Sequence, residues 1–135
     1  MKKNRNYIWI ISIMLIAIFM MPMKAQADPD PRYWHWITSN DEFGYFVSTK
    51  KPTKYYTGVK QWVMSVKADG SYSISLEGFR WNNGKEYAIL QFTKYDSDGS
   101  VEETLKAPYV TWEIAIPDSV GEGIWDYVDR QVRFQ

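Results

Sequence analysis

Hydrophobic and polar residues alternate with a period of two in two adjacent segments, residues 61–67 and 72–77. Such alternation is typical of β-strands, because successive side chains point to opposite faces of a sheet. Asp69-Gly70 lies between the two segments, and this dipeptide favours a tight hairpin turn in which glycine adopts a positive φ. We therefore expect a β-hairpin here, with one apolar face on each strand: Trp62, Met64 and Val66 on the first, and Tyr72, Ile74 and Leu76 on the second.

Similar short alternating segments occur before and after this hairpin. Residues 33–38 and 43–48 flank the turn-forming stretch 39–42, which predicts another hairpin. Residues 87–95 and 101–105 follow two further glycine turns, and residues 109–116 read as a half-buried strand with Val110, Trp112, Ile114 and Ile116 on its apolar face. Residues 50–58 show no clear period and suggest a crossing loop. The chain therefore predicts about six or seven short strands.

One helix is expected at the C-terminal end. Ser119 and Glu122 have the spacing of a capping box, in which the two side chains bind free backbone amides at a helix start. Val120, Ile124, Val128 and Val132 then recur every four residues, with Trp125 beside them, and form one apolar stripe. The fold class predicted is α+β: a single antiparallel sheet with one C-terminal helix packed on a face, beside the strand that precedes it.

The N-terminal segment reads as an export signal. Lys2, Lys3 and Arg5 precede an apolar run over residues 8–21, and Ala25 and Ala27 frame an A-x-A cleavage site. The run is shorter than the roughly 20 residues that a membrane-spanning helix needs. We expect cleavage after Ala27, with an uncleaved anchor as the alternative. The predicted organisation is a signal peptide (1–27), an extended leader (28–32) and one domain (33–135), with no permanent membrane span after cleavage.

Charge and cysteine content narrow the function. The 135-residue chain has 16 basic and 16 acidic residues, but cleavage would leave 12 against 16, a net charge of −4. Such a domain has no basic excess with which to neutralise a phosphate backbone, so no nucleic-acid partner is expected. The chain contains no cysteine, which excludes disulfides and lipid attachment through cysteine. Packing of the aromatic residues, 17% of the chain, is expected to stabilise the domain.

Candidate catalytic and metal-binding residues are few. His35 is the only histidine, so a catalytic triad would have to use it, and we expect it instead at a solvent-facing strand position. Asp96 and Asp98 approach a calcium-loop pattern, but their spacing to Gly99 is too short, and capping of a turn is expected. The adjacent Glu102 and Glu103 would point to opposite faces of a strand. The sequence predicts neither an enzyme nor a cofactor or metal site.

Tryptophans supply the candidate binding residues. Trp62, Trp112 and Trp125 are predicted to lie in the core, since each occupies an apolar face of a predicted strand or helix. Trp34 and Trp36 alternate on the first strand, and one of them is expected to be exposed. An exposed tryptophan is a common anchor at interfaces. Trp34 and Trp36 are therefore the candidate binding residues.

The chain resembles small exported bacterial domains of the surface-adhesin protein E family. The features that carry the resemblance are residues 34–39, the strand 59–66 with Trp62, the turn 95–100, and residues 112–119 with the helix that follows. The resemblance covers most of residues 33–134. It implies an antiparallel sheet with a C-terminal helix and, for some members, adhesion to host extracellular-matrix proteins. In that family a cysteine often fixes the helix to the sheet, and this chain has none, so no binding residue is carried over.

Taken together, these features predict an exported, non-catalytic binding or adhesion module in the periplasm or at the cell surface. Its partner would be a protein or glycan of the envelope or of a host surface. Two alternatives remain open at this point: an inhibitor of a secreted or host enzyme such as lysozyme, and a small structural protein of the envelope.

Overall fold

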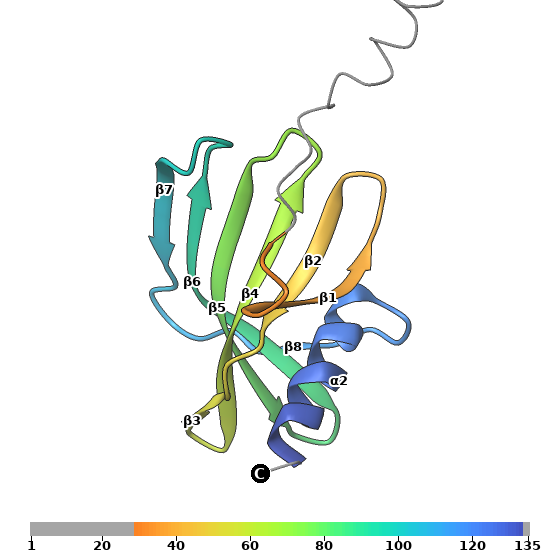
Figure 1. Ribbon diagram of the computed structural model, residues 1–135. Helices are drawn as coiled ribbons and strands as arrows, with labels where there is room; N and C mark the ends of the chain where they lie inside the picture. Colours follow the sequence, from red (N-terminus) through yellow and green to blue (C-terminus); the bar gives the residue numbers. More distant parts are fainter. Residues whose placement is uncertain (1–28, 134–135) are drawn as a thin grey trace, which may run out of the picture.

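The computed structural model describes residues 29–133 (Figure 1). The predicted signal peptide, the cleavage site predicted at Ala25 and Ala27, and the first residue of the predicted leader lie outside these residues. The described chain forms eight strands and one helix: β1 (Trp34–Ser39), β2 (Phe43–Ser48), β3 (Thr53–Tyr55), β4 (Gly58–Lys67), β5 (Tyr72–Trp81), β6 (Lys85–Tyr95), β7 (Val101–Lys106), β8 (Glu113–Ile114) and α2 (Val120–Arg133).

All strands join one antiparallel sheet, which confirms the predicted fold class. The strand order is β1-β2-β4-β5-β6-β7, with the short β3 added to β4 and the short β8 added to β6. Every pairing is antiparallel, and most neighbours in the main path follow one another in the chain. The segment expected to be a loop at residues 50–58 contains β3, whose three residues pair with the start of β4.

Helix α2 lies across one face of the sheet and contacts β1, β2 and β6 (Figure 1). It does not lie simply beside the preceding strand, as the sequence suggested, because that strand is only two residues long. The buried core forms between helix and sheet: Val47, Val63 and Phe79 from the sheet, and Ile124, Trp125 and Val128 from the helix. The predicted stripe is confirmed at Ile124 and Val128, whereas Val132, near the helix end, is 37% exposed.

The two faces of β4 differ in what covers them. The regular apolar pattern lies on one face, and the helix packs on the other. Val63 belongs to the core under the helix, so strand alternation places Trp62, Met64 and Val66 on the other face. Their partners on β5 share that face: Leu76, Ile74 and Tyr72 pair with them in register. The prediction of Trp62 as a core residue is wrong, because 38% of it is exposed on this face, which the helix does not cover.

Residues 109–116 differ most from the expectation. Only Glu113 and Ile114 form a strand, paired with the start of β6, and Ile114 and Ile116 are 69% and 70% exposed. The buried residue is instead Ala115. Alternation predicted a strand, but β7 already pairs with residues 91–95 of β6, which leaves only a short stretch of that edge for this segment. Trp112 is therefore half-buried rather than a core residue.

Trp112 nevertheless packs on the sheet. The Arg80 guanidinium lies 4.1 Å from the centre of its ring, and Gly78 leaves space directly beneath it. Arg80 also donates from Nε to Glu86 Oε2 at 2.6 Å. The indole thus covers a partly buried ion pair instead of an apolar core.

The start of α2 follows the predicted cap with one change. The Glu122 backbone amide donates to Ser119 Oγ at 3.2 Å, as a capping box requires. The Glu122 carboxylate accepts from the Asp118 amide, one residue before the expected partner. Gly123 brings the helix close to β1, since a Cβ there would lie 3.2 Å from Ile37 Cγ2.

A close backbone approach at Gly58 yields a stability prediction. A Cβ at this position would collide with the Phe79 carbonyl on β5 and lie 2.9 Å from Arg80 Cβ. Gly58→Ala is expected to destabilise the protein by about 1–3 kcal/mol, because the two strands would have to separate. Gly84→Ala is the matched control, since nothing lies within 4 Å of its Cβ position. Urea unfolding measures both, and equal effects would contradict this account.

Candidate functional site

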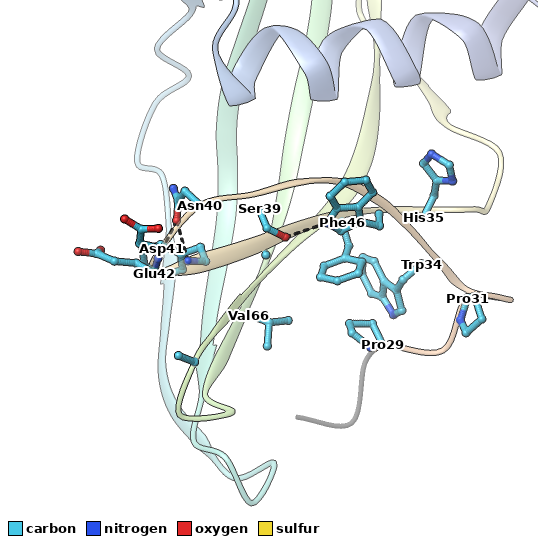
Figure 2. A pocket seen from close by; sticks show the side chains of 14 residues that line it. Pro29, Pro31, Trp34, His35, Ser39, Asn40, Asp41, Glu42, Phe46 and Val66 are labelled. Carbon is cyan, nitrogen blue, oxygen red and sulfur yellow. Dashed lines mark hydrogen bonds between the residues drawn. The ribbon is translucent and has the colours of Figure 1, made fainter. Parts of the chain in front are cut away.

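A groove lies at the β1–β2 end of the sheet, on the face opposite the helix (Figure 2). Its volume is about 730 Å³, within the range of ligand-binding clefts. Aromatic, proline and aliphatic side chains make up most of its wall, and short polar and acidic side chains form one end. The lining residues are Pro29, Pro31, Trp34, His35, Trp36, Ser39, Asn40, Asp41, Glu42, Phe43, Gly44, Phe46, Val66 and Ala68.

The structure brings both predicted binding residues into this groove. Trp34 and Trp36 are two positions apart on β1, so they share a face, and Trp36 lies opposite Phe46 in the β1–β2 register. Trp36 is 56% exposed, and Trp34 is half-buried. The expectation that one of the two is exposed is confirmed, while their role in binding stays a prediction.

Trp36 is held in place although it is exposed. Its indole Nε1 donates to Ser39 Oγ at 2.8 Å, and the register of β1 against β2 shifts between Trp36 and Thr38, within the same stretch. The polar atom of the indole is thus satisfied within the protein. The exposed area left for a partner is mainly apolar ring surface.

The acidic end of the groove is a rigid turn. Asn40 Oδ1 accepts from the backbone amides of Glu42 at 2.9 Å and Phe43 at 2.7 Å, and the Asn40 amide donates to the Phe43 carbonyl. This Asx turn leaves the carboxylates of Asp41 and Glu42 exposed at the rim. Sequence reasoning identified the turn but missed its role in the groove, since only the fold brings its acidic residues together with Trp36.

The leader contributes the remaining wall. Pro29 and Pro31 lie beside Trp34 (Figure 2). The leader was expected to be extended, but residues 31–33 make a turn in which the amides of Tyr33 and Trp34 donate to the Asp30 carbonyl. The Asp30 carboxylate pairs with Arg32 at 2.7 Å, and this hydrogen-bonded pairing lowers the pKa of Asp30.

His35 points away from the groove. Its ring lies on the helix side of the sheet (Figure 2) and stacks on Tyr127, with centroids 4.2 Å apart and planes at 4°. The residue is exposed, as predicted. Stacking on Tyr127 gives the His35 ring a structural contact on the opposite side of β1 from the two tryptophans.

The other candidates from the sequence serve the fold. Asp98 Oδ1 accepts from the amide and the hydroxyl of Ser100, which confirms the turn-capping interpretation. Glu102 contacts Lys94 at 3.5 Å. Residues 29–133 contain no group of three or more side chains that could hold a metal ion. Within the same range, no helix has the length and apolar character needed to cross a membrane.

One titratable group that sequence reasoning missed lies beneath the helix. Glu77 on β5 is 8% exposed and borders a cavity of about 170 Å³ with Phe79, Tyr87 and Ile124. Its carboxylate accepts a hydrogen bond from Ser75 Oγ at 3.2 Å, and no described cation pairs with it. Burial raises the pKa of Glu77 to about 7, against a small opposing effect of Ser75.

Comparisons with known proteins give no assignment. No protein-family model matches the chain. No curated protein and no solved structure matches it either. The resemblance to the surface-adhesin protein E family therefore stays a prediction, and the function has to be argued from the groove.

Proposed function

We propose that this chain is an exported, non-catalytic binding module of the cell envelope, and that the groove along β1 and β2 receives its partner. The observation that carries the proposal is the state of Trp36: more than half exposed, yet fixed by the bond to Ser39. An ordered, exposed tryptophan in a concave site fits a binding anchor, because little conformational entropy is lost when a partner covers it.

The surroundings of Trp36 support the same proposal. Trp34, Phe46 and Val66 form a continuous apolar wall next to it, and such a wall favours partner contact over a purely structural surface. The export signal predicted for residues 1–27 would place this groove outside the cytoplasm. A protein partner is favoured over a glycan, because an extended segment can pair with the edge of β1 beside the groove.

Site-specific cross-linking tests the groove as the binding surface. A photoreactive amino acid is placed at position 41, on the groove rim, and at position 102 on β7 as control, in full-length chains made in the native host. We expect a defined cross-linked product from position 41 and none from position 102. The same product from both positions, or none from position 41, contradicts the proposal.

Trp36→Ala provides the matching loss-of-function prediction. The substitution removes the anchor ring and is expected to reduce the cross-linked product from position 41 at least fivefold. The folded protein should lose no more than about 0.5 kcal/mol of stability, because Trp36 is exposed. Trp81→Ala is the control: Trp81 is 67% exposed on the end of β5, outside the groove, and its loss should leave the product unchanged.

A further inference from the structure

The groove carries acidic side chains among its described lining residues. Asp41 and Glu42 line it, whereas none of the lining residues within the described range 29–133 is lysine or arginine. Arg32, next to Pro31 in the chain, is already paired with Asp30. Lys67 is not among the groove's lining residues. Its ammonium lies 5.7 Å from the Phe43 ring centre, and the residue lines a separate cavity on the face of the sheet where the helix packs. The groove therefore combines electron-rich ring faces with two carboxylates and no positive charge of its own.

Such a combination is complementary to a cation. An ammonium or guanidinium group is attracted by the face of an aromatic ring, most strongly by tryptophan. Carboxylates at the rim add Coulomb attraction and accept its hydrogen bonds. Bonds from Trp36 to Ser39 and from the Glu42 amide to Asn40 hold the ring and the acidic turn at fixed positions, so the site is ordered before a partner arrives.

The position of the groove at the edge of the sheet favours an extended partner. β1 ends the strand order and pairs only with β2 among the described strands. Its outer backbone amides and carbonyls can therefore bind a further extended segment, as in strand addition at a sheet edge. A glycan could use the ring faces and donate hydroxyl hydrogen bonds to the carboxylates, but it would neither pair with the strand edge nor neutralise the two negative charges.

We propose, on the basis of the binding function argued above, that the groove binds an extended basic peptide segment, with a lysine or arginine side chain over Trp36 and its charge beside Asp41 and Glu42. The apolar part of that side chain packs on Trp34 and Phe46, and its main chain runs along β1. The partner is thus a protein with an exposed basic stretch.

Binding of a defined probe tests this inference. The exported chain, purified in the form in which cells accumulate it, is titrated into a fluorescein-labelled octapeptide of alternating lysine and serine, and anisotropy is followed at low and high salt. We expect saturable binding that weakens with salt, and none to the matched peptide of alternating glutamate and serine. Equal binding of both peptides, or no binding of the basic one, overturns the proposal.

Substitutions distinguish the contribution of the Trp36 ring to peptide binding from that of the two carboxylates. Trp36→Ala is expected to lower the affinity for the lysine peptide about five- to thirtyfold, and Trp36→Phe should restore part of that affinity. Asp41→Asn combined with Glu42→Gln should weaken it about two- to tenfold at low salt and less at high salt. Glu102→Gln combined with Glu103→Gln changes the net charge equally at a remote, exposed site and should have less than a twofold effect. Equal effects of the two pairs contradict the proposal.

A titration with a glycan distinguishes the case in which only the basic-peptide inference is wrong from the case in which the proposed binding function is wrong. The tetramer of N-acetylglucosamine is titrated by calorimetry against the same variants. Binding of the glycan that is lost in Trp36→Ala, without binding of the lysine peptide, overturns the basic-peptide inference and retains the groove as a binding surface. Failure of the cross-linking at position 41 would instead reject the binding function itself.

Discussion

Trp125→Ala is expected to destabilise the protein by about 3–5 kcal/mol, the cost of removing a large buried aromatic side chain. Trp125 is 8% exposed and joins helix α2 to the sheet. Its indole Nε1 donates to the Arg80 carbonyl at 3.3 Å, and the Lys85 ammonium lies 5.5 Å from its ring centre. The substitution leaves a cavity in the only apolar layer under the helix, in a domain with no disulfide to limit the loss.

Urea unfolding monitored by circular dichroism measures this effect. Trp81→Ala is the matched control, because Trp81 touches the edge of Trp125 with ring centres 6.1 Å apart but is 67% exposed. Its loss should cost less than about 1 kcal/mol. If the two variants unfolded at the same urea concentration, the helix–sheet core would not depend on Trp125 as the structure indicates.

Glu77→Gln is expected to stabilise the protein at pH 8 by up to about 3 kcal/mol. Burial raises the pKa of Glu77 from 4.5 to about 7, and each pKa unit corresponds to about 1.4 kcal/mol. The folded state therefore holds a proton that the unfolded state releases between these two values. The bound proton contributes fully to the free energy of unfolding below pH 4.5, and this contribution is lost as the pH rises through about 7. Glutamine stays neutral at every pH and avoids this loss.

The difference in unfolding free energy between Glu77→Gln and the unchanged chain, measured from pH 4 to pH 8, tests the prediction. We expect little difference at pH 4 and a growing advantage of the variant toward pH 8. Glu103→Gln, at an exposed position of β7, is the control and should show no such trend. A constant advantage across the range would indicate altered packing rather than the buried charge.

Glu77 also shows why some features could not be found from the sequence. Residues 72–77 alternate regularly, with Glu77 in a polar position, which predicts exposure to solvent. The helix packs on that polar face of β5 and buries Glu77 beside Phe79 and Ile124. Which face of a strand is buried depends on the side of the sheet on which the helix packs. The alternation of residues along the strand is the same in both cases, so it cannot predict that side.

The sequence by itself determined the main elements of this protein and their order, with the exceptions of the short β3 and the strand expected over residues 109–116. The two-residue period, the glycine and asparagine turns and the capping residues at Ser119 and Glu122 are local, and they act within a few residues of the chain. For that reason the hairpins, the antiparallel sheet and the start of α2 are confirmed. One expectation about a site, that Trp34 or Trp36 is exposed, is also confirmed, although the two-residue spacing places both rings on one face and does not choose between them.

Only the tertiary structure decided which face of the sheet is covered and which residues share the groove. Both faces of β4 carry apolar residues, so the local pattern could not show that the helix packs over Val63 and leaves Trp62 exposed. The groove likewise depends on the leader and on β4, because Pro29, Pro31 and Val66 complete its wall beside the β1–β2 hairpin. These outcomes come from contacts between distant segments, whose free energy depends on the whole packed arrangement rather than on any short stretch of sequence.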